Sequence, residues 1–146
     1  MILYGLLLVF GCIAAVSDIK TRKIPNKLII AMLCAWMFTI VIMLLGSIDT
    51  AAVQLLKSAI GFVFCAGLFL LVYIVSGKGL GGGDVKFMAA AGLYLGIDGA
   101  VPVILFGTVL AALTGMVLIL LKKIRRKDPI PLAPFLFTGM LITAFL

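Results

Sequence analysis

The sequence predicts an all-α fold, a polytopic membrane bundle of about six transmembrane helices with both termini on the non-cytoplasmic side. Of the 146 residues, 65% are hydrophobic and the mean hydropathy is +1.39, whereas a soluble domain is roughly 45–50% apolar. The charged residues are confined to short segments between long apolar runs. A chain of this length is expected to form one membrane-embedded domain, 1–146.

Six apolar segments result when the chain is divided at its charged residues. They are 1–17, 28–48, 58–76, 85–97, 99–121 and 130–146. A membrane-spanning helix needs about 20 mostly apolar residues, and five of the segments have about that length. The segment 85–97 is shorter, which is typical of a thin, tilted or partly re-entrant helix. The first segment has no basic start and no convincing cleavage site, so we expect it to be retained as a span.

Basic residues predict the orientation, because loops rich in Lys and Arg stay on the cytoplasmic side. If the six segments cross in alternation, Lys57 falls alone on one side, and the other basic residues fall on the opposite side. That opposite side is therefore expected to face the cytoplasm, in a plasma (inner) membrane. We expect its basic residues to contact anionic lipids. This placement accounts for the net charge of +7 without a nucleic acid partner.

The composition excludes several kinds of chemistry. The chain has no histidine and no glutamate, so every His-dependent triad and most sets of metal ligands are excluded, and the carboxylate side chains are five aspartates. Cys12, Cys34 and Cys65 each lie singly in an apolar run, which indicates neither a zinc site nor a disulfide framework. We therefore expect no metal and no cofactor. Three aspartates have ordinary positions in turns and a basic loop, namely Asp49, Asp98 and Asp128.

Asp18 and Asp84 differ, because each lies where an apolar segment meets the predicted cytoplasmic face. Asp18 could be a charge-paired helix end beside Lys20 and Arg22, and Asp84 could be a helix N-cap. The glycines before Asp84 favour another interpretation. Glycine removes side-chain bulk and permits positive φ, so an extended peptide could approach the backbone closely there.

Two carboxylates close together in a partly desolvated site share a proton and titrate as a pair. The ionised member can deprotonate a water molecule that attacks a peptide carbonyl. The protonated member can donate its proton to the carbonyl oxygen. The sequence does not indicate which of Asp18 and Asp84 is charged.

The residues around both aspartates carry a resemblance to a known family. Gly81-Gly82-Gly83-Asp84 fits a G-x-G-D motif, and Ile24-Pro25-Asn26 follows Asp18. The sequence resembles the type IV prepilin peptidases and archaeal preflagellin peptidases, which are G-x-G-D membrane aspartic peptidases. The stretch 130–136 is similar to the family's proline- and phenylalanine-containing start of the last span, with Ala133 where the family often has glycine.

The resemblance implies an aspartic endopeptidase that removes the short basic leader of type IV pilin-like precursors at the cytoplasmic membrane face. Asp18 and Asp84 would be the catalytic pair. Positioning of the substrate would fall to Gly81, Gly82, Gly83, Pro25 and Lys86. Many bacterial relatives carry a further segment with paired cysteines and also N-methylate the product. The chain lacks such cysteines, so it looks most like the short Tad/Flp-type peptidases, and we expect cleavage without methylation. A homo-oligomer is compatible with the sequence.

Other classes of function stay open. A non-enzymatic transporter or assembly scaffold could use the aspartates to bind protons or cations, although a transporter site is expected near the bilayer midplane. A G-x-G-D peptidase that processes signal peptides or membrane stubs would place its aspartates deeper within the spans. A degenerate scaffold has no support, since both aspartates are present.

Overall fold

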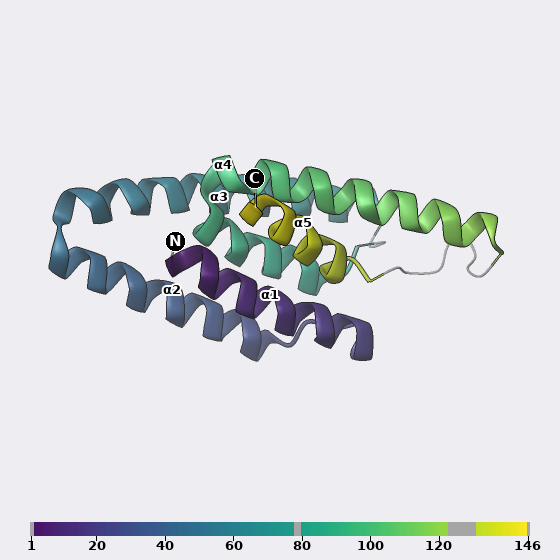
Figure 1. Cartoon of the computed structure of the whole chain (residues 1–146), viewed down its shortest axis with the longest axis horizontal. Coiled ribbons are helices and arrows are strands. Elements are labelled where there is room, and N and C mark those ends of the chain that lie inside the picture. The colour runs from purple at the N-terminus through teal and green to yellow at the C-terminus, as the bar shows by residue number, and fades with distance from the viewer. Residues whose placement is uncertain (1, 78–79, 123–130, 146) are drawn as a thin grey trace.

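The structure is a computed structural model that describes residues 2–77, 80–122 and 131–145, and its regular elements are all helices (Figure 1). They are α1 (Ile2–Thr21), α2 (Asn26–Gly46), α3 (Ile48–Val75), α4 (Gly82–Leu120) and α5 (Ala133–Phe145). The prediction of an all-α fold is therefore confirmed for the described part of the chain. Pro131 and Leu132 lead into α5, whereas most of the basic cluster at 122–127 lies outside the described residues.

The outer surface of the bundle is apolar. Helices α1 to α4 are each long and apolar enough to cross a membrane, and α5 is a shorter apolar helix. Large apolar side chains point outward along them, with Leu45, Val75 and Leu120 exposed by 85%, 78% and 75%. Continuous apolar surface of this extent is costly in water and favourable in lipid. The chain is an integral membrane protein, and its number of crossings stays a prediction.

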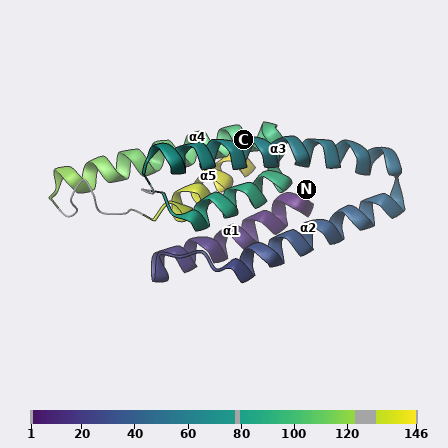
Figure 2. The same cartoon turned by 180° about the vertical axis from the view of Figure 1, so that it is seen from behind.

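Helix α4 consists of two helices that meet at Gly96. Gly96 has a φ of 62° and a ψ of −173°, a backbone conformation outside the helical region. Glycine adopts such a conformation readily because it lacks a Cβ. The chain reverses direction at this point, so the part of α4 before Gly96 and the part after it run in opposite senses (Figures 1 and 2). The predicted boundary between 85–97 and 99–121 lies close to this glycine.

Two predicted boundaries are wrong. Helix α3 begins at Ile48 rather than at residue 58, so Asp49 and Lys57 lie within the helix and Ser47 alone separates α2 from α3. Division at charges treated these two residues as loop positions, but Asp49 in a first turn is favourable to the helix dipole. Helix α4 begins at Gly82 rather than at residue 85, so Gly82 and Gly83 already lie within the helix.

Helices α3 and α4 approach each other closely through small residues. A Cβ at Gly61 would lie 2.6 Å from the Cα of Gly96, and a Cβ at Gly92 would lie 2.7 Å from the carbonyl carbon of Gly61. Beside this contact the buried Ser58 hydroxyl donates to the Leu93 carbonyl at 2.5 Å and accepts from Trp36 Nε1 at 3.2 Å. Small residues at such a contact let two helix backbones approach closely.

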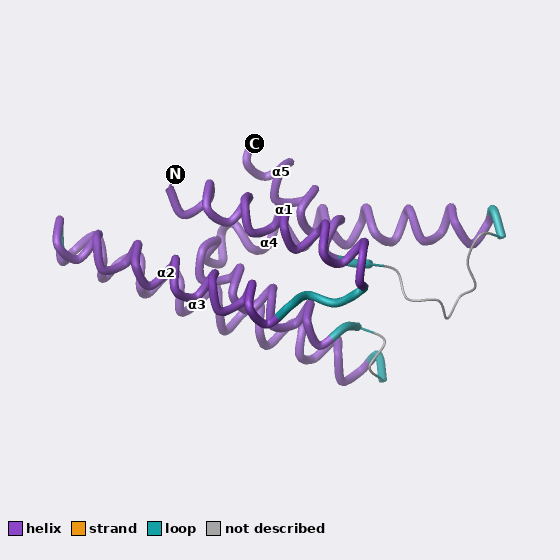
Figure 3. Tube along the Cα trace, turned by 90° about the horizontal axis from the view of Figure 1, so that it is seen from below, coloured by secondary structure: helices purple, strands orange, loops and turns teal. Residues whose placement is uncertain are grey.

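Helix α5 packs between α1 and the second half of α4. At one end, the Tyr4 hydroxyl donates to the Met140 carbonyl at 3.0 Å, so the start of α1 and the end of α5 lie together. A Cβ at Gly139 would lie 2.6 Å from the Val103 carbonyl, which shows how closely α5 meets α4. The starts of α2, α4 and α5 gather at the opposite end (Figure 3). Both described chain ends therefore lie on one side of the bundle, away from these helix starts.

Candidate active site

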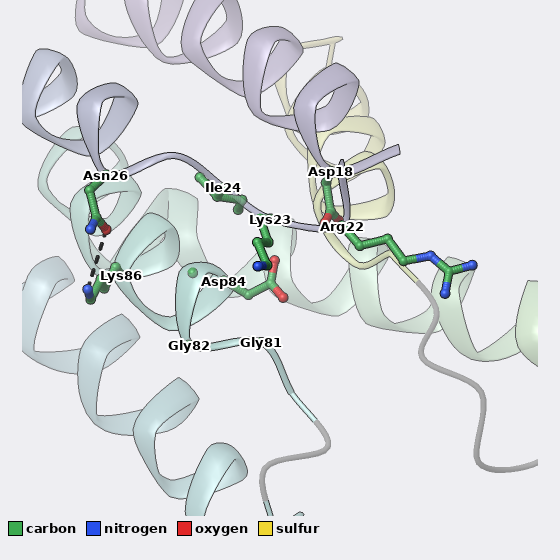
Figure 4. Close-up of a pocket in the computed structure, with 10 residues that line it drawn as sticks. Asp18, Arg22, Lys23, Ile24, Asn26, Gly81, Gly82, Asp84 and Lys86 are labelled. Atoms are coloured by element: carbon green, nitrogen blue, oxygen red, sulfur yellow. Dashed lines mark hydrogen bonds between the residues drawn. The ribbon is translucent and has the colours of Figure 1, made fainter. Parts of the chain in front are cut away.

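A pocket of about 370 Å³ opens at the end of the bundle where α2 and α4 begin. Its walls come from the end of α1, the α1–α2 connection and the start of α4 (Figure 4). The lining residues are Asp18, Arg22, Lys23, Ile24, Asn26, Gly81, Gly82, Gly83, Asp84 and Lys86. The structure thus brings Asp18 and Asp84, 66 residues apart in the sequence, into one pocket.

Asp18 lies in the last turn of α1 and is buried, with 5% of its surface exposed. Its Oδ2 accepts a hydrogen bond from the backbone N–H of Ala133 at 3.2 Å. Ala133 is the first residue of α5, and it is fully buried. The N-terminus of α5, which is the positive end of the helix dipole, therefore faces the Asp18 carboxylate.

Asp84 is the third residue of α4, after the N-cap position that Gly81 occupies. Its backbone N–H donates to the Gly81 carbonyl at 3.0 Å. The side chain is 9% exposed, and its Oδ1 has no hydrogen-bond partner among the described residues. In Figure 4 this side chain extends from α4 toward the end of α1 that carries Asp18. Asp84 is therefore a first-turn residue aimed into the pocket and does not occupy the N-cap position.

Both carboxyl groups lie just beyond the apolar stretches 1–17 and 85–97 that we expect to cross the membrane. Burial raises the pKa of Asp18, and the backbone N–H groups of Ala133 and Leu132 oppose that rise. Burial also raises the pKa of Asp84, to about 6, and the negative charge of Asp18 adds to this rise while the backbone at Gly81 opposes it. The ionisation of Asp84 is thus disfavoured while Asp18 is charged.

The three glycines before Asp84 differ in how closely other atoms approach them. A Cβ at Gly83 would lie 3.3 Å from the Ile24 Cβ, and a Cβ at Gly81 would lie 2.9 Å from Asp84 Oδ2, whereas a Cβ at Gly82 would meet nothing within 4 Å. None of the three has a positive φ, so what they contribute here is the missing side chain. Gly81 and Gly83 let the chain pack closely around Asp84, and Gly82 faces open space.

The other predicted positioning residues have separate places. The Lys86 ammonium donates to Asn26 Oδ1 at 3.4 Å and so links the start of α4 to the start of α2 (Figure 4). Pro25 occupies the N-cap position of α2 with an extended backbone and does not line the pocket. Its fixed φ suits the turn between α1 and α2.

Sequence reasoning missed three contributors to the site. Arg22 lines the pocket with a φ of 51°, an uncommon backbone conformation for a non-glycine residue, and its N–H closes α1 by donating to the Asp18 carbonyl at 2.8 Å. Lys23 also lines the pocket, although its charge had been assigned to topology. Ala133 contributes a backbone N–H, and the only signal for it was the resemblance of the stretch 130–136.

The raised pKa of Asp84 predicts that its ionisation destabilises the fold. The folded protein holds this proton up to about pH 6, whereas an unfolded chain releases it near pH ~3.9. Stability should therefore be greatest below about pH 4 and fall as pH rises toward 6. Asp84→Asn should stabilise the protein at pH 7 by about 3 kcal/mol and flatten the pH dependence. Thermal unfolding in detergent between pH 4 and 7 tests this, with Asp98→Asn as the control. The same pH slope in both variants would contradict the prediction.

Comparison with known proteins places the chain in a family. The sequence model of the type IV leader peptidase family matches residues 5–119, a range that includes Asp18, the glycines and Asp84. The chain belongs to the type IV leader peptidase family. The resemblance noted in the sequence is thereby confirmed. No solved structure matches the chain.

Curated members of the type IV leader peptidase family are similar over most of the chain. The protein named prepilin leader peptidase/N-methyltransferase of Bacillus subtilis is 31% identical over 130 residues, which cover 89% of this chain and 50% of that protein. Its namesake in Xanthomonas campestris is 32% identical over 124 residues, or 82% and 41% of the two chains. A third, from Burkholderia pseudomallei, is 29% identical over 142 residues, or 93% and 45%. The chain thus spans half or less of the length of these relatives.

Proposed function

We propose that this protein is a membrane aspartic endopeptidase that removes the short basic leader from type IV pilin-like precursors. The observation that carries the proposal is the meeting of two buried carboxyl side chains, Asp18 and Asp84, in one open pocket. Membership of the type IV leader peptidase family supports the class of substrate.

The proposed reaction is hydrolysis by an acid–base pair. The ionised carboxylate takes a proton from water, whose oxygen attacks the scissile carbonyl, while the protonated carboxyl donates to the carbonyl oxygen. The pKa of about 6 for Asp84 supports such a division, because one proton then remains on the pair up to about pH 6. Gly82, whose missing Cβ leaves open space, is proposed to let the extended substrate approach the backbone.

The membrane arrangement belongs to the same proposal. Six crossings would follow if the two halves of α4 cross separately, and their opposite directions support this count. An even number of crossings places both termini on one side, in agreement with the contact between Tyr4 and Met140. The pocket would then lie on the cytoplasmic side with Arg22, Lys23 and Lys86 around it.

A second candidate activity, N-methylation of the product, is suggested by the names of the relatives. We propose that these 146 residues cleave without methylating, because they match half or less of each of these relatives and contain no paired cysteines. No S-adenosylmethionine or metal is part of this proposal. A transporter or scaffold is less well supported, since the paired carboxylates lie at one end of the bundle.

Co-expression with a precursor tests the proposal directly. The precursor would carry a short basic leader immediately before a hydrophobic helix, and cleavage would be followed by gel mobility and by mass spectrometry of the new N-terminus. We expect a product shortened at the start of its hydrophobic helix, with an unmodified amine. An intact precursor in the presence of folded protein would refute the peptidase activity. A methylated product would refute the proposed restriction to cleavage.

A further inference from the structure

The two carboxyl groups of the pocket have different hydrogen-bond environments. Asp18 Oδ2 accepts the N–H of Ala133 at 3.2 Å, at the positive end of the 13-residue helix α5. A buried anion that accepts a backbone N–H at a helix N-terminus is stabilised by both the hydrogen bond and the dipole. A negative charge on Asp18 is therefore partly compensated within the protein.

Asp84 is less well compensated. It lies in the first turn of α4, which favours a negative charge, and its Oδ2 faces the backbone at Gly81. Its Oδ1, however, is buried without a partner among the residues that the structure describes. An ionised carboxylate with one such oxygen loses its hydrogen bonds to water and gains none from the protein, which costs free energy. A protonated carboxyl group avoids most of this cost because it carries no charge.

The surrounding charges leave this difference in place. Three cationic side chains line the pocket, Arg22 and Lys23 from the α1–α2 connection and Lys86 from α4, and all three are exposed to water that screens them. Lys86 follows Asp84 by two positions and so projects from a different face of α4, toward Asn26 (Figure 4). The described start of α5, Pro131 to Pro134, brings no charged group.

We infer that Asp84 carries the shared proton on Oδ1, that Asp18 is the ionised member, and that the Ala133 N–H is the group that positions Asp18 and holds it ionised. The catalytic meaning of this assignment rests on the proposed function. Asp18 would then take the proton of the attacking water as the new C–O bond forms, and Asp84 would protonate the carbonyl oxygen. As the C–N bond breaks, Asp18 returns its proton to the amine nitrogen and Asp84 regains one from the hydrated carbonyl.

Infrared spectroscopy of the purified protein tests the assignment without any substrate. At pH 5.5 in a detergent without carbonyl groups, the C=O band of a buried, protonated carboxylic acid should be present in the wild type and in Asp18→Asn. The band should be lost in Asp84→Asn, and it should be unchanged in Asp98→Asn, which lies outside the pocket. A band that persists in Asp84→Asn and disappears in Asp18→Asn would overturn the assignment.

The role of the α5 N-terminus is tested by removing its donor. Ala133→Pro lacks the N–H, and proline is well tolerated at the first position of a helix, whereas Ala133→Gly keeps the N–H. Ala133→Pro should gain infrared intensity from a second protonated carboxyl group. The pH below which its cleavage rate falls should rise by about one pH unit, because Asp18 is then protonated more easily. Ala133→Gly should keep the infrared spectrum and the pH dependence of cleavage of the wild type.

Each outcome separates the inference from the proposed function. Equal spectra for Ala133→Pro and wild type would refute the positioning role, whatever the activity. Failure of the wild type and of Ala133→Gly to cleave the precursor, with the expected spectra, would refute the peptidase function and leave the proton assignment standing. If Ala133→Pro does not fold, the spectra of Asp18→Asn and Asp84→Asn still decide which carboxyl holds the proton.

Discussion

Replacement of either pocket carboxylate by asparagine is expected to lower precursor cleavage by at least about 10³-fold. Asparagine keeps the size of the side chain but can neither accept the proton of the attacking water nor donate one as an acid. Asp18→Asn removes one half of this exchange and Asp84→Asn the other, so each single change should be nearly as severe as both together. Cleavage rates measured on membranes with matched amounts of enzyme test this prediction.

The chain offers matched controls for these two changes. Asp49 and Asp98 are exposed and lie outside the pocket, so Asp49→Asn and Asp98→Asn should cleave at rates close to that of the wild type. Wild-type cleavage by either pocket variant would refute a two-carboxylate mechanism. A loss of activity that is equal in all four variants would indicate a general effect of charge on insertion or folding.

The second large effect is expected at the contact between α3 and α4. Gly61→Leu should destabilise the protein by about 3 kcal/mol or more. A Cβ there would lie 2.6 Å from the Gly96 Cα and closer still to the Gly92 carbonyl oxygen. Because these atoms belong to the backbone of α4, a rotamer change cannot relieve the clash, and the two helices have to separate. Thermal unfolding in detergent, together with size-exclusion chromatography, measures the loss.

Gly67→Leu is the control for this substitution. Gly67 lies on the same helix, and a Cβ at this position would meet nothing within 4 Å. The added leucine should face lipid and leave stability close to that of the wild type. A similar loss of stability in both variants would show that the glycines matter for helix flexibility rather than for close packing.

Much of the fold could be predicted because its main signals are local. Apolar length and the spacing of charges indicated the helices, including the break near Gly96. The boundary at Ile48 was missed because an isolated charge such as Lys57 marks either a loop or the end of a helix that extends past the apolar core, and local sequence does not distinguish the two. The reversal at Gly96 depends on one backbone conformation, which the neighbouring Asp98 indicated only indirectly.

The site could be predicted only as far as side chains carry its chemistry. Asp18 and Asp84 have a recognisable sequence pattern, and the structure brings them into one pocket. The N–H of Ala133 belongs to the backbone, and its contact with Asp18 joins positions 115 residues apart, so no residue type indicates it. The link between Lys86 and Asn26 likewise depends on how α2 and α4 begin side by side.

The turn at Gly96 also bears on the thickness of the bilayer around Asp84. The arm of α4 between Gly82 and Gly96 has about 14 residues and rises about 21 Å, whereas the hydrocarbon core of a bilayer is about 30 Å thick. If this arm crosses the membrane by itself, as proposed, local thinning of the lipid around it would relieve a hydrophobic mismatch of this size. A thinned leaflet would shorten the path of water to the carboxyl group that begins the arm, and water is a reactant of the proposed hydrolysis.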